Sequence, residues 1–518
     1  MSTKDKFIEE IKNAYSFKDD YFTLGGTIFE GECISNLFVN VPLKTLNRHG
    51  LIAGATGTGK TKTLQIIAEQ LSSKSIPVLV MDVKGDFSGI AKAGTVNPKI
   101  EERYNKIGLQ YTASGFPVEL LSLSEEKGVR LRATVFEFGP VLLSKILELN
   151  DTQSSFVSLI FKFCDDSQLP LLDLKDFKRV LQFISDEGKQ EIEKQYGSIS
   201  TTSVGTILRK VIELEQQGAE KFFGEKSFEV NDLVRIDEQG RGVVSIIRLV
   251  DLQDRPKLFS TFMLSLLAEI YSSFPEEGDL PQPKLVIFID EAHLIFKEAS
   301  KALLEQIEII IKLIRSKGVG IFFCTQNPTD VPASVLSQLG LKVQHALRAF
   351  TAKDRQMIKL TAENYPLSEF YKTDELLTSL GIGEAAITAL NEKGSPTPLA
   401  ATLLRAPQSR MEILSDDEIN ELVRNSKLVP KYNETIDRES AYELLNRKLE
   451  VSVKEKEFTL PRYETPKQTR GRPKEEKSTF EKVLTSPTTR QIGNTVVREL
   501  ARGILGVLGL GGSARRRK

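Results

Sequence analysis

The stretch Gly54-Ala-Thr-Gly-Thr-Gly-Lys-Thr61 matches the pattern G-x-x-x-x-G-K-[S/T] at every fixed position. A short apolar run, His49-Gly-Leu-Ile-Ala53, precedes it, and residues with helical apolar spacing follow it as far as Ser73. Glycines allow backbone N–H groups to converge on phosphate oxygens, which a Cβ atom would obstruct. A strand, a glycine-rich turn and a helix in this order therefore predict a phosphate-binding loop.

The parts of this loop have distinct expected roles. Lys60 brings positive charge to the β- and γ-phosphates of a nucleotide, and the Thr61 hydroxyl is a ligand for Mg²⁺. The N-terminus of the following helix adds a favourable dipole. The residues predicted to bind the nucleotide are Gly54, Ala55, Thr56, Gly57, Thr58, Gly59, Lys60, Thr61 and Thr63.

Three more buried strands are expected beyond the loop. Pro77-Val-Leu-Val-Met-Asp82 completes a strand–helix–strand unit, which predicts a parallel sheet. Lys284-Leu-Val-Ile-Phe-Ile-Asp290 and Gly320-Ile-Phe-Phe-Cys-Thr325 are apolar runs of the same kind. Because the carboxyl ends of parallel strands share one edge of a sheet, polar residues at these ends are expected beside the phosphate loop.

The acidic pair Asp290-Glu291 ends one of these strands. A carboxylate at the exit of a buried strand costs free energy unless it meets a cation or a donor. Asp290 is predicted to hold the Mg²⁺ shell through water, and Glu291 to orient and polarise the attacking water. The alternative for the pair is a solvated acidic cap on the strand. His293 is expected to pack near the site.

Gln326, Arg315 and Arg348 are the other catalytic candidates. Gln326 follows the next strand and can reach the γ-phosphate or its water, or else cap the following turn. Arg315 ends the preceding helix, where a cation is favourable with the helix dipole. At an edge facing a neighbouring subunit it would instead act as an arginine finger. Arg348 is either a second nucleotide-sensing arginine or a structural one.

Taken together, these motifs resemble the HerA–FtsK superfamily of P-loop motor ATPases, and most of all the stand-alone bacterial HerA-like proteins. The segments 47–53, 315–320 and 381–386 look like connecting segments of that subgroup, and the likeness covers residues 40–410. It implies a RecA-like core, a homohexameric ring and hydrolysis of ATP with Mg²⁺ between subunits. Arg315 matches the position of a finger arginine in related motors.

The resemblance also has a departure. HerA proper carries an N-terminal β-barrel domain, which serves partner docking in HerA–nuclease complexes, whereas only a short segment precedes the loop here. The leading functional prediction is a ring ATPase that moves DNA. The alternative is an ATP-dependent switch or assembly platform for a protein partner, without translocation.

The predicted fold class is α/β, with a RecA-like P-loop NTPase core, a mainly parallel sheet, a helical insertion and a C-terminal helical or disordered arm. The expected divisions are an N-terminal helix and small β element (1–47), the ATPase core (48–406) with its insertion (140–225), a helical segment and linker (407–490), and an amphipathic helix with a basic tail (491–518). Strands are expected at 131–138 and 242–249, and helices at 142–163, 174–184, 201–216, 257–271 and 299–316.

Composition narrows the class further. The 518 residues include 70 Lys and Arg against 70 Asp and Glu, which argues against a nucleic-acid coat protein but leaves room for a local basic channel. Three distant cysteines predict neither a zinc site nor a disulfide framework. The N-terminus lacks the apolar run of a signal peptide, and no run is long enough to span a membrane, so a cytoplasmic protein is expected.

Two features of the C-terminal arm have open interpretations. The basic segment 469–474 can enter a minor groove, although glutamates follow it and a solvated linker is the expected state. In residues 491–518, apolar residues spaced by four lie on one helical face before a basic end. This helix is expected to pack within the chain or between subunits. The alternatives are a membrane surface and nucleic acid.

Overall fold

The computed structural model describes residues 2–124, 126–252, 255–278, 280–298, 301–434, 436 and 438–458. Its strands are β1 (Tyr21–Phe29), β2 (Glu32–Pro42), β3 (Gly50–Ala53), β4 (Val78–Asp82), β5 (Val118–Ser122), β6 (Val129–Arg130), β7 (Val244–Arg248), β8 (Leu285–Ile289), β9 (Val319–Thr325), β10 (Leu341–Gln344), β11 (Glu384–Thr388) and β12 (Ala400–Leu404).

The helices of the first two thirds of the chain are α1 (Thr3–Ala14), α2 (Lys60–Ser73), α3 (Pro98–Ile107), α4 (Val135–Ile146), α5 (Asp151–Asp166), α6 (Leu174–Ser185), α7 (Lys189–Tyr196), α8 (Thr201–Gln216), α9 (Pro256–Ser273), α10 (His293–Glu298), α11 (Lys301–Ile314) and α12 (Ala333–Leu336). They are followed by α13 (Ala352–Ala362), α14 (Thr373–Ser379), α15 (Asp416–Asn425), α16 (Val429–Tyr432) and α17 (Ala441–Phe458).

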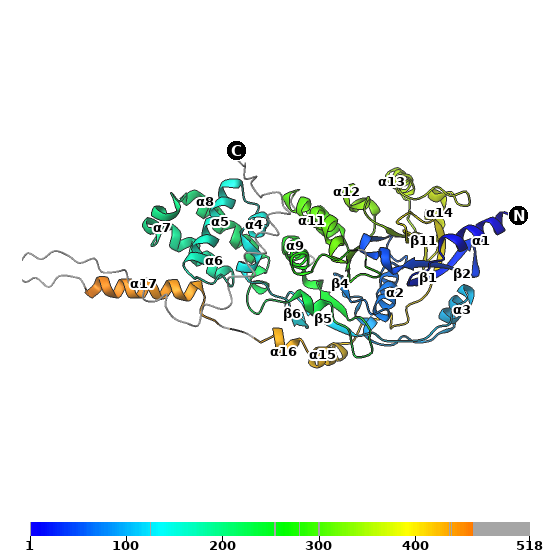
Figure 1. The fold of residues 1–518 in the computed structure, drawn as a ribbon, viewed down its shortest axis with the longest axis horizontal. Coiled ribbons are helices and arrows are strands. Elements are labelled where there is room, and N and C mark those ends of the chain that lie inside the picture. The colour runs from blue at the N-terminus through cyan, green and yellow to red at the C-terminus, as the bar shows by residue number, and fades with distance from the viewer. Residues whose placement is uncertain are drawn as a thin grey trace, which may run out of the picture.

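The described strands form one twelve-stranded sheet with the order β2-β1-β12-β11-β10-β3-β9-β8-β4-β7-β5-β6. Figure 1 shows β1, β2 and β11 toward the end of the molecule that carries α1, and β5 and β6 farther from it. The eight strands from β10 to β6 in this order pair in parallel, whereas β2, β1, β12 and β11 pair antiparallel. The predicted α/β class with a mainly parallel sheet is confirmed. The strand β3, which leads into the phosphate loop, lies between β10 and β9.

The central strands are buried on both faces, which explains their continuous apolar sequences. Along β8, Ile287 and Ile289 belong to the core shared with α9, α11 and the helical insertion. Val286 and Phe288, which point the other way, belong to the core shared with α1 and α2. The sheet is therefore the middle layer between two helical layers.

The N-terminal segment continues this sheet. β1 pairs antiparallel with both β12 and β2, and α1 packs against β2. The Tyr15 hydroxyl lies 2.7 Å from the Pro398 carbonyl oxygen and 3.1 Å from that of Ile387. The segment expected as a small β element is thus joined to the far end of the core sequence by backbone and side-chain hydrogen bonds.

Helices α4 to α8 span residues 135–216, where the sequence predicts an insertion at 140–225, and Figure 1 places them at the end of the molecule opposite α1. The strand expected at 131–138 is wrong, because β6 ends at Arg130 and α4 begins at Val135. Thr134 caps that helix and Glu137 completes the capping box, which outweighs the β-propensity of the segment. The helix expected at 142–163 is two helices, because Asn150 starts α5 with a second capping box.

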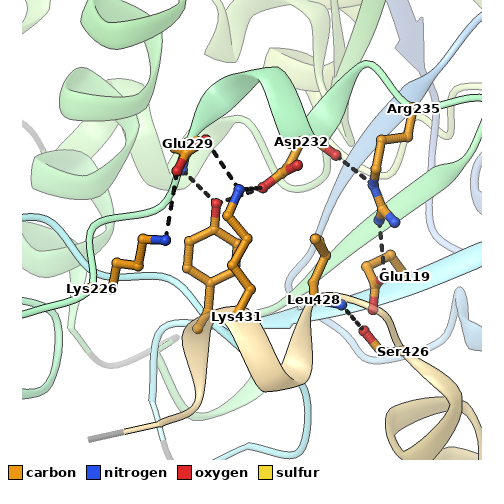
Figure 2. Close-up of polar contacts among 9 residues, drawn as sticks. Glu119, Lys226, Glu229, Asp232, Arg235, Ser426, Leu428 and Lys431 are labelled. Atoms are coloured by element: carbon orange, nitrogen blue, oxygen red, sulfur yellow. Dashed lines mark hydrogen bonds and ion pairs between the residues drawn. The ribbon is translucent and has the colours of Figure 1, made fainter. Parts of the chain in front are cut away.

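After β12 the chain returns to the end of the sheet formed by β5 and β6. α15 packs on β5, α16 on β6, and α17 on α6 of the insertion. We call residues 426–433 the strap. Figure 2 shows its Lys431, whose Nζ donates to Glu229 (3.0 Å) and Asp232 (2.8 Å) beside the 3₁₀ turn Val230–Leu233. The strap therefore links the segment after β12 to the segment that follows α8.

Two further predictions concern the C-terminal arm and membrane spans. The basic segment at 469–474 and the amphipathic helix at 491–518 lie outside the described residues. Within the part of the chain that the structure covers, every helix is too short or too polar to cross a bilayer.

Candidate nucleotide site

The phosphate loop follows β3 and has the backbone that its glycines permit. Gly54, Gly57 and Gly59 have φ angles of 151°, 79° and 112°, which side chains with a Cβ rarely adopt. A Cβ on Gly54 would lie 2.5 Å from the Cβ of His345, whereas the space beside Gly57 is open. The loop therefore packs closely on the protein at its start and leaves an open cradle at its centre, ahead of the N-terminus of α2.

Lys60 lies buried at the base of this cradle. Its Nζ donates to the carbonyl oxygens of Gly54 (2.7 Å) and Ala55 (3.2 Å), so the side chain folds back along the loop. Burial lowers the pKa of Lys60, and the nearby charge of Lys84 adds to this effect. An ammonium group in this position gains most from an anion that enters the cradle.

The predicted acidic pair lies at the same sheet edge, at the end of β8. Lys84, from the loop after β4, forms an ion pair with Glu291 Oε1, and His293 Nδ1 lies 3.1 Å from Oε2. Burial raises the pKa of Asp290 to about 7; Lys84 opposes this shift, and the charges of Glu291 and Asp82 add to it. His293 packs beside the pair, as the sequence predicted.

Sequence reasoning missed three residues of this site: Asp82, Lys84 and Asp86. The Thr61 hydroxyl donates to Asp86 Oδ2 at 3.4 Å. Asp82 accepts from the backbone N–H groups of Gly85 (2.7 Å) and Phe87 (3.2 Å), and burial raises its pKa to about 6. The signal was present, because Asp82 ends a buried strand as Asp290 nearly does, and β4 and β8 are parallel neighbours.

The residues at this edge fit Mg²⁺. The Thr61 hydroxyl and the carboxylates of Asp290 and Asp86 are oxygen ligands, which a small divalent cation prefers. No group of three or more His, Cys, Asp or Glu side chains arranged to hold a metal occurs in the described ranges. An ion here would take its remaining ligands from phosphate oxygens and water, as Mg²⁺ in nucleotide sites commonly does.

Gln326 lies beside the phosphate loop. Ala53 of β3 and Thr325 of β9 are in register, and the Gly54 N–H donates to the Thr325 carbonyl oxygen at 3.3 Å. Gln326 follows directly and is half-buried. The sheet therefore brings Gln326 to the same side as the cradle, as expected for residues at the carboxyl ends of parallel strands.

Arg315 lies on the opposite side of the sheet's strands, at the amino-terminal end of β9. It is exposed in a 3₁₀ turn before β9, whose seven residues separate it from Gln326 by about 20 Å along the strand. Arg315 therefore cannot reach the phosphate loop of its own chain. A role for Arg315 as a finger would therefore require the phosphate loop of a second copy of the chain.

The segment after β10 contacts the phosphate loop directly. The Ala55 N–H donates to the Ala346 carbonyl oxygen (2.9 Å), and His345 Nε2 lies 2.8 Å from the Thr63 hydroxyl. Thr63 is buried, so it faces this segment rather than the open cradle. Arg348 follows two residues later, exposed, and donates to the Thr378 carbonyl oxygen at 3.3 Å.

The chain is similar to a family of known proteins. Residues 31–516 match the family described as Helicase HerA-like C-terminal. The DNA double-strand break repair helicases HerA of Sulfolobus acidocaldarius and Sulfurisphaera tokodaii are 24% and 26% identical to this chain, and the matches cover 68% and 70% of it. The same matches cover 64% and 66% of those two proteins, slightly less than two thirds of their length.

Among solved structures, the bacterial conjugative coupling protein TrwB, in the form TrwBdeltaN70, superposes with a TM-score of 0.50 at 14% identity. The superposition covers 79% of this chain and 94% of that one. This likeness concerns the fold, and it confirms the RecA-like P-loop core that the sequence predicted. With a family match across nearly the whole sequence, the chain belongs to the helicase HerA-like C-terminal family.

Proposed function

We propose that this chain is an ATP-hydrolysing subunit of an oligomeric motor that acts on DNA, with ATP and Mg²⁺ as its cofactors. The observation that carries the proposal is the meeting of the phosphate loop with Asp290 and Glu291 at one sheet edge, where Lys84 pairs with Glu291. A cradle for phosphates, oxygen ligands for a cation and a carboxylate to act on water are the parts that phosphoryl transfer to water requires.

Each part has a task in this proposal. The loop and Lys60 hold the phosphates, and Thr61 with Asp290 would hold Mg²⁺, which supplies positive charge against the phosphate oxygens. Glu291 orients a water molecule and accepts its proton as the water oxygen bonds to the terminal phosphorus, while the bond from that phosphorus to the bridging oxygen breaks and ADP leaves. Gln326 holds the same water or a terminal phosphate oxygen. Lys84 releases Glu291 as the anionic phosphates draw its ammonium group toward them.

The proposed assembly relates the two opposite ends of the parallel strands, one with Arg315 and the other with the phosphate loop. A head-to-tail contact joins two different faces of identical subunits and closes into a ring where the rotation permits. Such a contact brings the edge with Arg315 of one copy to the phosphate loop of the next. We therefore propose a homo-oligomeric ring, a hexamer, whose sites form between neighbours.

DNA is the proposed partner, since relatives of this chain are named as DNA double-strand break repair helicases. Steady-state ATP hydrolysis should rise when duplex DNA is added at low salt, and Lys60→Ala should abolish hydrolysis with and without DNA. Mass measurement of the assembly should give a multiple of the chain mass. Hydrolysis that DNA leaves unchanged would contradict the motor and favour an ATP-dependent platform for a protein partner.

A further inference from the structure

The order of the strands gives the phosphate loop a direction. The acidic strand β8 lies on the β9 side of β3, whereas β10 and β11 lie on the other side. In the function proposed above, on which this inference rests, the terminal phosphate points toward Asp290 and Glu291. The nucleoside end of the nucleotide then extends toward the loops next to β10 and β11.

One of those loops touches the phosphate loop. We call residues 381–383, which lead into β11, the GIG loop. The Gly383 N–H donates to the Thr58 carbonyl oxygen at 3.1 Å. A Cβ on Gly59 would lie 3.5 Å from the Gly383 nitrogen, so the two backbones are in close contact. Whatever side chain the GIG loop presents therefore stands next to the phosphate cradle.

Hydrogen bonds hold the GIG loop in place. Arg103 Nη1 donates to the carbonyl oxygens of Gly383 (3.1 Å) and Leu404 (2.9 Å), and Nη2 donates to that of Ile382 (3.3 Å). At the start of the loop, the Gly381 N–H donates to Glu384 Oε2 at 2.7 Å. Gly383 has φ +74°, which residues with a Cβ rarely adopt, so glycine suits this position.

The side chain that this loop presents is apolar and exposed. Ile382 stands between two glycines with 73% of its surface exposed. A β-branched side chain on a backbone held from both sides has few conformations left to lose when it is covered. An exposed isoleucine fixed beside a phosphate cradle suits the flat apolar face of a nucleobase.

We propose that Ile382 is the surface on which the base of the bound nucleotide packs, and that Arg103 is the positioning residue that holds the GIG loop there. The occupant is the base of the same nucleotide whose phosphates lie in the cradle, because the hydrogen bond from Gly383 to Thr58 makes the two surfaces continuous. The contact is apolar, so it adds affinity for nucleosides and leaves the grip on phosphates unchanged.

The test compares ATP with inorganic tripolyphosphate, which has the phosphates but no base. Binding of both is measured by calorimetry for the full-length protein and for Ile382→Ser. ATP should bind about tenfold more weakly to the variant, because part of an isoleucine side chain stays exposed to water, and tripolyphosphate should bind equally well. The KM for ATP should rise by about the same factor while kcat stays unchanged.

Ile236→Ser is the matched control. Ile236 is also exposed, at 53%, but it pairs with Gly242 just before the amino-terminal end of β7, away from the phosphate loop. This variant should bind both ligands as the unaltered protein does. Arg103→Gln, which frees the GIG loop, should lose affinity for ATP in the same selective way as Ile382→Ser.

Four results would overturn the proposal. If Ile382→Ser binds ATP as tightly as the unaltered protein does, Ile382 does not contact the base. If the variant loses affinity equally for ATP and tripolyphosphate, the GIG loop supports the phosphate cradle instead of the base. If the oligomer of Ile382→Ser has a lower mass than that of the unaltered protein, Ile382 is a contact between subunits. Equal affinity of the unaltered protein for ATP and tripolyphosphate excludes any base site while leaving the proposed function intact. The proposed function itself fails if the unaltered protein binds neither.

Discussion

Four carboxylates and two lysines surround the phosphate cradle. Asp86, Asp290 and Glu291 lie near Lys84, Asp82 accepts from the backbone of the loop after β4, and burial makes ionisation of Asp82 and Asp290 costly. A buried carboxylate without a cation tends to take up a proton, and the raised pKa values describe this state. Mg²⁺ held by Thr61 and Asp290 would favour the ionised carboxylates, because its two positive charges would offset their negative charge.

The first prediction separates binding from chemistry at this site. Lys60→Ala should weaken nucleotide binding and abolish turnover, because the phosphates lose their charge partner. Glu291→Gln should bind ATP as before and hydrolyse it about 100-fold more slowly or worse, since an amide cannot accept the proton from water. Calorimetry and steady-state hydrolysis measure the two effects, with the exposed Glu363→Gln as control. Turnover near normal in Glu291→Gln would remove this residue from the mechanism.

The second prediction concerns His49, a buried histidine at φ 60° between the 3₁₀ helix Leu43–Arg48 and β3. Its Nδ1 accepts from the Ile321 N–H at 3.0 Å, and its Nε2 lies 2.9 Å from the Ile311 carbonyl oxygen. Burial lowers the pKa of His49 to about 4, and the charge of Arg315 adds to this effect. Below pH 6.5, the ordinary pKa of histidine, His49 takes up a proton in the unfolded chain but stays neutral in the folded protein. The free energy of unfolding should therefore fall as pH drops from 6.5 toward 4.

His49→Asn isolates this contribution. Asparagine tolerates positive φ and does not titrate, so the variant should be less stable at pH 7.5 but lose less stability on acidification. The difference between the two proteins should shrink by about 2–3 kcal/mol across this pH range. Denaturant unfolding at pH 7.5 and pH 5 measures it. Parallel loss of stability in both proteins would exclude His49 as the titrating group.

At the scale of elements, the strap is held by polar contacts around a buried tyrosine. Tyr432 is fully buried, and its hydroxyl donates to Asp232 at 2.5 Å and accepts from the Glu229 N–H at 3.1 Å. Asn433 continues the attachment, because its side chain accepts from the Arg130 N–H (2.8 Å) and donates to the Gly128 carbonyl oxygen (3.0 Å). A helix of four residues cannot hold itself, so these contacts position α16.

The third prediction is that Tyr432→Phe loosens the strap. The change leaves Asp232 and the Glu229 N–H without their hydroxyl partner, at a cost of about 1–3 kcal/mol. Hydrogen exchange should become faster at residues 426–433 and stay unchanged in the central strands. Tyr442→Phe is the matched control, since Tyr442 is 43% exposed on α17. Equal exchange in Tyr432→Phe and the unaltered protein would show that the hydroxyl bonds do not hold the strap.

At the scale of the whole molecule, the parallel sheet separates two candidate parts of one catalytic site. The phosphate loop, Glu291 and Gln326 lie at the carboxyl ends of the strands, and Arg315 lies before the start of β9. In the proposed ring, a neighbouring copy of the chain would bring its Arg315 to the phosphate loop.

The fourth prediction tests this geometry by mixing inactive variants. Arg315→Ala should bind ATP normally and hydrolyse it on the order of 10³-fold more slowly, as expected for a lost arginine finger. Lys60→Ala has a defective loop and an intact Arg315. Mixed assemblies of the two should regain activity, because some sites pair an intact loop with a neighbour's arginine. The measurement is ATP hydrolysis after subunit exchange.

Mixing Lys60→Ala with Glu291→Gln provides the control. Both changes damage the phosphate edge of their own subunit, so no pairing rebuilds a complete site and no activity should return. If mixed assemblies of Arg315→Ala and Lys60→Ala form but stay inactive, Arg315 does not act between subunits. Arg348, which follows the segment that contacts the loop, then becomes the arginine to test.

Much of the fold and site could be predicted from the sequence, because the signals are local. The phosphate loop needs only its glycines, Lys60 and Thr61 between a strand and a helix. Helix α8 coincides with the predicted 201–216 because its apolar spacing and its Ser200 cap agree. The strand predicted at 131–138 failed where two local signals disagreed, and capping by Thr134 decided for a helix.

What only the tertiary structure decided depends on which strands become neighbours. β3 pairs with β9 and β10, which come from some 270 or more residues further along the chain, and local sequence does not encode that choice. The same packing brings Lys84 to Glu291 and Gly383 to Thr58. The sequence by itself thus determined the chemistry of the phosphate loop and its acidic pair. The partners around them were decided by how the apolar faces of distant strands and helices bury one another, a property of the whole core.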